Sequence, residues 1–144
     1  MINIYIDTTG SMTEMGKDSA VLYIAKSIED YCDFKSIENC FYQLNGAAIK
    51  ELTSLSFSND VRVDFKSELE NSILISDGLF EIEDIKIFDV AISVGIDADI
   101  FNLEKISQKL FTSDNVLSAL EYLIFHNDLL ESAPKILEED DDEW

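Results

Sequence analysis

Three short apolar runs, separated by stretches of helical periodicity, constrain the fold of this chain more than any other feature. The runs are "INIYID" (2–7), "SILIS" (72–76) and "DVAISVGI" (89–96). Runs of this length that are apolar almost throughout are typical of strands buried on both faces of a parallel sheet. Between the first two runs, apolar residues recur at helical spacing from Glu14 to Cys32. This alternation predicts an α/β fold with a doubly wound, mostly parallel sheet flanked by helices.

A hairpin is expected between the first helix and the second buried strand. The runs "CFYQL" (40–44) and "AAIKELTSL" (47–55) are separated by an Asn-Gly pair, which predicts two antiparallel strands. The alternating segment "DVRVDF" (60–65) then indicates another short strand or an extended connection.

The remaining periodic stretches predict helices. Thr13 is a suitable N-cap for the first of them. A second helix is expected over 100–111, where apolar residues share one face, and a third from a cap at residues 113–114 to the helix breaker Pro134.

The composition indicates one compact domain followed by an acidic tail. The 144 residues are 47% hydrophobic with a mean hydropathy of +0.03, which suits a chain that buries a core. Because no Pro- or Gly-rich linker divides it, residues 1–134 are expected to form the domain. Residues 135–144 include "EEDDDEW" and are expected to be disordered. Trp144 could anchor this tail in a basic, apolar groove of a partner.

The net charge restricts the classes of partner. Asp and Glu number 30 against 10 Lys and Arg, which gives a formal charge of −20. This charge disfavours nucleic acids and anionic membranes and favours cations or basic proteins. Without a transmembrane run or a signal peptide, a cytoplasmic protein is expected. Cys32 and Cys40 are then expected to be buried, reduced thiols.

The segment "YIDTTGSMTEMGK" gathers oxygen atoms where the first strand ends. Asp7, Thr9 and Ser11 alternate along it, so their side chains can converge on one point. Gly10 would allow a tight turn, and the following helix start would offer N–H groups to anionic or water ligands. Asp77 follows another buried strand, and the carboxyl ends of parallel strands meet at one edge of a sheet. Two carboxylates and two hydroxyls suit Mg²⁺ and leave coordination positions open.

These motifs resemble those of von Willebrand factor A domains. "IYIDTTGSM" resembles the family's metal-ion-dependent adhesion site, D-x-S-x-S, with Thr9 in place of the first serine. "ILISDGLF" is similar to the family's later strand ending in Asp-Gly, and "AISVGIDADIFNLEKISQKLF" to its last strand, loop and helix. The motifs occur in the family's order and the resemblance covers most of the chain.

Membership would imply a sheet with helices on both faces and one antiparallel edge strand. It would also imply a non-catalytic interaction module that holds Mg²⁺ or Mn²⁺, with an Asp or Glu of a protein partner completing the coordination. Stand-alone cytosolic members often work with AAA+ ATPases or in stress and defence systems. Carried over by position, the metal ligands are Asp7, Thr9, Ser11 and Asp77. The candidate partner contacts are Met12, Gly78 and Trp144.

The chain departs from the family before the Asp-Gly strand. The family's loop threonine has no counterpart between Leu55 and Ile73, and a helix near 79–89 is reduced to "FEIEDIK". Another hydroxyl, a water molecule or nothing could replace the threonine. The nearest hydroxyl residues are Thr53, Ser56, Ser58 and Ser67.

Other interpretations stay open. Thr8, Thr9 and Ser11 could merely satisfy backbone groups at a strand-to-helix turn. "DTTGSMTE" also resembles the D-K-T-G-T-L-T-E phosphorylation motif of P-type ATPases, relatives of the haloacid dehalogenase phosphatases, in which Asp7 would be the nucleophile and Asp77 a Mg²⁺ ligand. Against this, Thr8 stands where that motif has lysine, and no lysine is clearly placed to offset phosphate charge. A domain this acidic could also mimic nucleic acid and occupy a DNA-binding protein.

Overall fold

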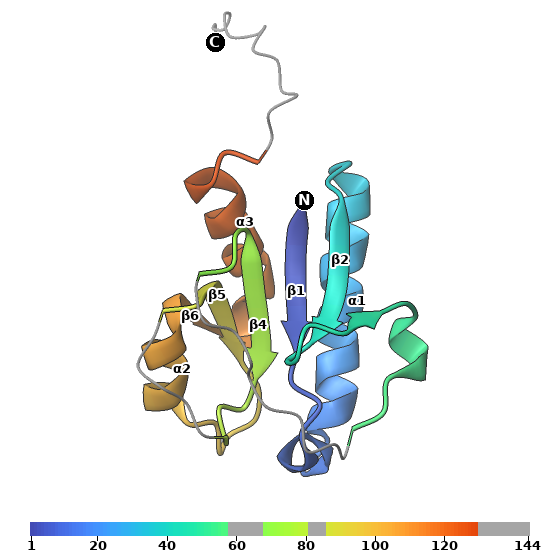
Figure 1. Cartoon of the computed structure of the whole chain (residues 1–144), viewed down its shortest axis with the longest axis vertical. Helices are drawn as coiled ribbons and strands as arrows, with labels where there is room; N and C mark the ends of the chain where they lie inside the picture. Colours follow the sequence, from blue (N-terminus) through green and yellow to red (C-terminus); the bar gives the residue numbers. More distant parts are fainter. Residues whose placement is uncertain (58–67, 81–85, 130–144) are drawn as a thin grey trace, which may run out of the picture.

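The computed structural model describes residues 1–57, 68–80 and 86–129. These residues form a six-stranded sheet in the order β3-β2-β1-β4-β5-β6 (Figure 1). Neighbouring strands are parallel except β2 and β3, so β3 is an antiparallel edge strand. The predicted α/β class is confirmed. The strands are β1 (Ile2–Ile6), β2 (Asn39–Gln43), β3 (Ala48–Ile49), β4 (Ser72–Ser76), β5 (Phe88–Ser93) and β6 (Ser107–Thr112).

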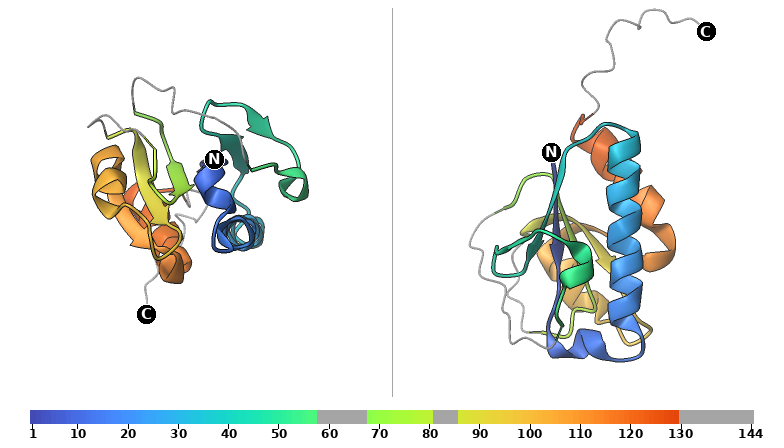
Figure 2. Two further views of the ribbon diagram at one scale, coloured as in Figure 1. Left: turned by 90° about the horizontal axis from the view of Figure 1, so that it is seen from below. Right: turned by 90° about the vertical axis from the view of Figure 1, so that its right-hand side faces the viewer.

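Helices cover both faces of the sheet. The long helix α1 and the helix α3 pack on one face, and α2 packs on the other (Figures 1 and 2). No helix among the described residues is both long and apolar enough to span a membrane. The helices are α1 (Lys17–Phe34), α2 (Ile100–Ile106) and α3 (Val116–His126).

Alternation along β1 builds a core on each face. Ile4 and Ile6 belong to the core under α1 and α3, whereas Tyr5 belongs to the core under α2 together with Leu74 and Leu103. Because both faces of the central strands are covered, apolar residues are required at successive positions. This is the physical origin of the continuous apolar runs in the sequence.

The segment expected as one helix over 100–111 is a helix followed by a strand. α2 ends at Ile106, and β6 pairs in parallel with β5. At the junction, the Ser107 hydroxyl donates to the Leu103 carbonyl at 2.6 Å. The single-helix prediction is wrong because pairing with β5 satisfies backbone groups that the sheet edge would otherwise leave open.

The hairpin is confirmed as antiparallel, but its second strand covers only two residues. Leu52–Ser54 forms a 3-10 turn where a longer strand was expected. The predicted capping role of Thr13 is also wrong. Gly16 occupies the cap position of α1, and the Thr13 hydroxyl donates to the Gly10 carbonyl at 2.7 Å instead.

Other boundaries are shorter than expected. β5 ends at Ser93, and α3 begins after a 3-10 turn over 113–115 and ends at His126, well before residue 134. The extended segment at 60–65 and the acidic tail at 135–144 lie outside the described residues.

Candidate functional site

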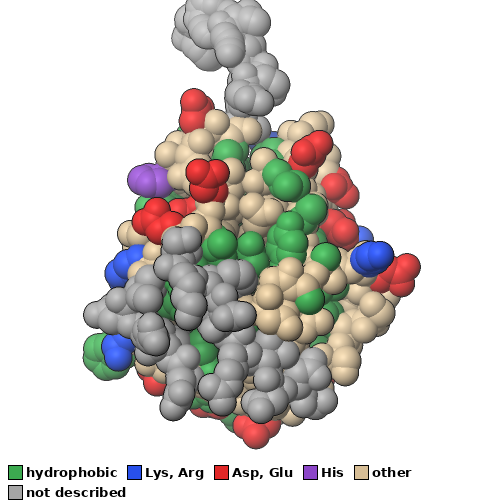
Figure 3. Space-filling view, viewed as in Figure 1, with side chains coloured by type: hydrophobic (Ala, Val, Ile, Leu, Met, Phe, Trp, Pro, Cys, Tyr) green, Lys and Arg blue, Asp and Glu red, His purple; other side chains and the backbone are tan. Residues whose placement is uncertain are grey.

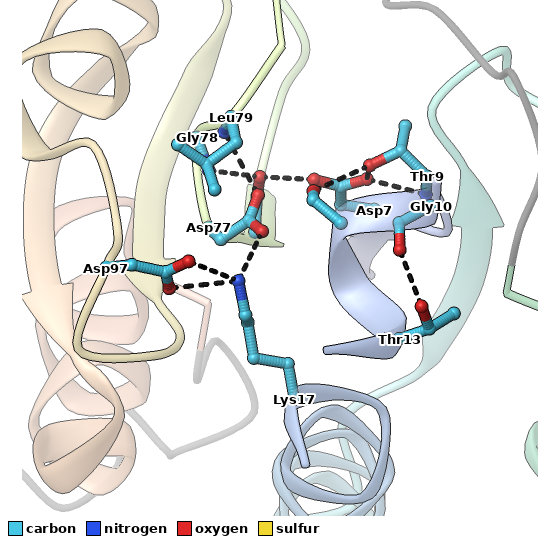
Figure 4. A network of polar contacts seen from close by, with 11 residues as sticks. Asp7, Thr9, Gly10, Thr13, Lys17, Asp77, Gly78, Leu79 and Asp97 are labelled. Carbon is cyan, nitrogen blue, oxygen red and sulfur yellow. Dashed lines mark hydrogen bonds and ion pairs between the residues drawn. The ribbon is translucent and has the colours of Figure 1, made fainter. Parts of the chain in front are cut away.

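The carboxyl ends of β1 and β4 meet at one edge of the sheet. The two strands are parallel neighbours, with Ile6 opposite Ile75. Asp7 and Asp77 follow directly after them, and both are completely buried. The Asp7 N–H donates to the Ile75 carbonyl at 3.0 Å, which extends the strand pairing to the site itself. The predicted juxtaposition of the two carboxyl groups between central strands is therefore present (Figure 4).

Asp7, Thr9 and Ser11 form a compact group of oxygen atoms. The Thr9 hydroxyl donates to Asp7 Oδ1 at 2.6 Å, and the Thr9 N–H donates to the same oxygen at 2.9 Å. Thr9 Oγ1 and Ser11 Oγ lie 3.5 Å apart. The other carboxylate oxygen, Asp7 Oδ2, accepts a hydrogen bond of 2.6 Å from the Ser76 hydroxyl at the end of β4. The three side chains that were predicted to converge do so.

The turn that carries this cluster differs from the expected one. Residues 10–13 form a 3-10 turn, and α1 begins only at Lys17. Gly10 is not among the residues with positive φ, and an added Cβ would meet nothing within 4 Å, so glycine is not required there. The backbone N–H group directed at Asp7 comes from Thr9 rather than from the start of α1.

Asp7 is a buried carboxyl group without a counter-charge among the described residues. Burial raises its pKa, the hydrogen bonds from Ser76 and Thr9 lower it, and the charge of Asp77 raises it, so that the net pKa is raised. Among the described residues, no lysine, arginine or histidine lies within ion-pair distance of Asp7. An ionised carboxylate is costly to bury unless it is paired, and none of the described side chains offsets the charge of Asp7, which agrees with its raised pKa.

Asp77, in contrast, has an internal counter-charge. The Lys17 side chain is only 1% exposed, and its Nζ donates to Asp77 Oδ2 at 2.9 Å (Figure 4). The same Nζ lies 2.9 Å from Asp97 Oδ1 and 3.0 Å from Asp97 Oδ2. Burial lowers the pKa of Lys17, but the hydrogen bonds and charges of Asp77 and Asp97 outweigh burial and raise it. Lys17, Asp77 and Asp97 are called the ionic triad below.

Sequence reasoning missed Lys17, although its position in α1 carries a signal. Lys17 lies on the same helical face as Val21, Ile24 and Ile28, which form the buried stripe of α1. A charged residue on a buried stripe needs a partner of opposite charge. Its stem also packs closely on Gly95, where an added Cβ would lie 2.9 Å from Lys17 Cδ. A lysine therefore does lie at the site, but its ammonium group is paired with Asp77 and Asp97.

The loop after β4 is held against α2. Gly78 has a left-handed backbone with φ +72°, and an added Cβ would lie 2.7 Å from the Asp99 carbonyl oxygen. Asp99 caps α2 by accepting the Asn102 N–H at 3.1 Å, and the Asn102 side chain donates to the Gly78 carbonyl at 2.9 Å. The Leu79 N–H donates to Asp77 Oδ1 at 3.0 Å. These contacts hold the loop that follows Asp77 against the start of α2.

Two of the three predicted partner contacts are buried. Met12 is 0% exposed and packs in the core under α1, and Gly78 is buried against Asp99, so a packing role replaces the predicted contact role. Trp144 lies outside the described residues. Exposed apolar side chains nevertheless occur in the segments that carry the site: Met15 (64% exposed), Leu79 (40%) and Ile96 (97%).

The donor set fits a hard divalent cation in part. Asp7, Thr9 and Ser11 offer oxygen atoms, the ligands that Mg²⁺ and Mn²⁺ prefer. Asp77 fits less well, because Oδ2 binds Lys17 and Oδ1 accepts the Leu79 N–H. Within 1–57, 68–80 and 86–129, no group of three or more His, Cys, Asp or Glu side chains is arranged to hold a metal ion. A metal at this site would therefore depend on hydroxyl and water ligands.

Two of the four hydroxyl residues considered as substitutes for the family's loop threonine lie among the described residues. Thr53 and Ser56 are exposed, and Ser58 and Ser67 lie outside the described residues.

Comparison of the sequence with protein-family models and with curated proteins finds no match to either.

Proposed function

We propose that this chain is a non-catalytic protein-interaction module, similar to a von Willebrand factor A domain, that binds a partner through Mg²⁺ or Mn²⁺. Asp7, Thr9 and Ser11 would hold the ion, with Asp77 beside them. The observation that carries the proposal is the buried Asp7 carboxyl group, which contacts hydroxyl groups but no cation in the described part of the chain. A divalent ion would supply that charge and an open position for an Asp or Glu of the partner.

The topology supports this proposal. An antiparallel strand at the edge and helices on both faces are the features that the family resemblance implies. In open α/β sheets, ligands bind outside the carboxyl ends of the strands, where Asp7 and Asp77 lie.

The hydroxyl groups also argue against a purely local turn. The Thr9 hydroxyl donates to the Asp7 carboxylate rather than to a backbone group. The Thr8 hydroxyl is buried and has no hydrogen-bond partner among the described residues. The turn interpretation requires these hydroxyl groups to bond backbone groups, and neither does so among the described residues.

The partner surface would combine a carboxylate with apolar contacts. Met15, Leu79 and Ile96 are exposed within one or two residues of Lys17, Asp77 and Asp97. Nucleic acids and anionic membranes are disfavoured by the charge of −20. On the face seen in Figure 3, acidic side chains lie on both sides of a stretch of exposed hydrophobic side chains. A cytoplasmic AAA+ ATPase or a stress or defence system remains the partner class that the family resemblance suggests.

Metal binding is tested by calorimetric titration of the full chain with MnCl₂ and MgCl₂. We expect binding by the wild type, none by Asp7→Asn, and weaker binding by Ser11→Ala. Thr13→Ala is a matched control, because this hydroxyl lies in the same 3-10 turn but donates to the Gly10 carbonyl. Absence of binding at millimolar metal, or equal binding by Asp7→Asn, would contradict the proposal.

Partner binding is tested by a pull-down with and without EDTA. We expect EDTA and Asp7→Asn to release the same protein. Deletion of residues 138–144 tests the tail: if complex formation is unchanged, Trp144 and the acidic residues before it do not bind the partner. A partner retained in EDTA with a strong dependence on salt would favour nucleic-acid mimicry instead.

The phosphoryl-transfer alternative has its own assay. Lys17 does lie at the site, but its ammonium group contacts Asp77 and Asp97, and no described cation is paired with Asp7. Release of phosphate from a generic phosphomonoester, lost in Asp7→Asn, would establish that alternative in place of the binding module.

A further inference from the structure

The ionic triad joins three separate elements around one buried ammonium group. Lys17 begins α1, Asp77 follows β4, and Asp97 lies in the loop between β5 and α2. Asp77 is completely buried, whereas the Asp97 side chain is 34% exposed. Lys17 thus bridges a buried carboxylate of the candidate site and a carboxylate that solvent reaches.

The ionic triad has one more negative than positive charge. Asp77 and Asp97 carry two negative charges against the single positive charge of Lys17, and Asp7 adds a further carboxyl group that no described cation contacts. A divalent ion that draws on Asp77 must compete with the ammonium group for Oδ2, since Oδ1 accepts the Leu79 N–H. Lys17 would keep Asp97 as a partner after such an exchange.

We infer that Lys17 determines the metal affinity of this site: it competes with the divalent ion for Asp77, and Asp97 is the carboxylate that holds Lys17 when Asp77 turns to the metal. The inference rests on the proposed function. Lys17 is a positioning residue, because it acts on the ion through Asp77. The site is consequently set to bind metal weakly until a partner's carboxylate joins it.

The inference predicts opposite effects for two substitutions. Lys17→Met removes the competing charge while filling the same space, so metal binding should tighten by about tenfold or more, given the strength of unit charges a few ångströms apart. Asp97→Asn leaves Lys17 with Asp77 alone, so metal binding should weaken. A purely structural role for the triad predicts loss of affinity, or no change, in both variants.

The experiment is Mn²⁺ titration by calorimetry, with thermal unfolding followed at rising Mn²⁺ concentration. The matched control is Lys26→Met, which removes an exposed lysine from the same helix, where it pairs with Glu29 and Asp30. We expect this control to bind as the wild type does. Mn²⁺ should raise the unfolding temperature of Lys17→Met more than that of the wild type, because tighter binding stabilises the folded state more.

Each outcome decides between the two proposals. Binding by the wild type that is unchanged or weaker in Lys17→Met overturns the inference and leaves the proposed function intact. Binding by Lys17→Met but not by the wild type supports the inference and refutes metal-dependent function of the natural chain. Absence of binding by every variant refutes both. If Lys17→Met does not fold, Asp97→Asn still tests the inference, since it retains the Lys17–Asp77 pair: equal or tighter metal binding by this variant overturns it.

Discussion

Replacement of Gly78 by alanine tests the geometry of the loop that holds Asp77. Gly78 has φ +72°, a left-handed conformation that costs a residue with a Cβ about 1–2 kcal/mol. The new Cβ would also lie 2.7 Å from the Asp99 carbonyl oxygen and 3.0 Å from Leu103 Cγ. Because one of these neighbours is backbone at the start of α2, the loop or the helix has to move.

The expected loss of stability combines the cost of the left-handed backbone with two further contributions. Forced overpacking costs about 1–3 kcal/mol, and alanine restricts the unfolded chain, which returns about 0.4–1 kcal/mol. The net expectation for Gly78→Ala is a loss of roughly 2–4 kcal/mol of unfolding free energy. For a chain of 144 residues this corresponds to a fall in the midpoint of thermal unfolding of roughly 5–15 °C.

The matched control is Gly16→Ala. Gly16 has nearly the same backbone, φ +73°, but an added Cβ there meets nothing within 4 Å. It should lose only the conformational contribution, about 1 kcal/mol or less after the unfolded-state gain. Urea unfolding of both variants gives the free energies directly. Equal stabilities of the two variants would refute the contact between Gly78 and the start of α2.

Three further predictions concern buried groups. Lys17→Met in the absence of metal should lower the unfolding free energy at pH 7 by about 3–5 kcal/mol, because it leaves Asp77 buried and unpaired. The control Lys26→Met should have the unfolding free energy of the wild type. Denaturant titration of both variants checks this. The pKa of Asp7 is higher in the folded chain than in the unfolded chain. At pH values between these two pKa values, the folded chain therefore keeps a proton that the unfolded chain has lost. Without metal, the stability that Asp7 contributes should therefore be present below about pH 4 and be lost as pH rises through the raised pKa; the stability difference from Asp7→Asn at each pH isolates this effect. Burial raises the pKa of the Cys32 thiol to about 11, so alkylation at pH 8 should modify the partly exposed Cys40 in the folded protein and both cysteines only after unfolding, as mass spectrometry can show.

The cysteines also illustrate a partial success of sequence reasoning. Cys32 is buried as predicted, on the apolar face of α1, but Cys40 is only partly buried. Cys40 lies on β2, between the central β1 and the short edge strand β3. The burial of a residue near a sheet edge depends on what covers that edge, which its own segment does not encode.

The positions of the two site carboxyl groups were predictable from local patterns. Asp7 and Asp77 each follow an apolar run, and a strand buried on both faces requires such a run wherever it occurs in a doubly wound sheet. The grouping of Asp7, Thr9 and Ser11 could also be predicted from the sequence, because side chains within one turn of the backbone lie close to one another. In both cases the relevant contacts are short in sequence or follow from the sheet class.

The amino-acid sequence alone thus accounts for the α/β class, the hairpin and the oxygen cluster, because each leaves a periodic or local pattern. Tertiary structure alone decided that residues 107–112 become β6, since their backbone groups bond to β5. It alone placed Lys17, whose partners are 60 and 80 positions away along the chain. A buried charge selects its partner by three-dimensional proximity in a low-dielectric interior, and that proximity exists only once the sheet has formed.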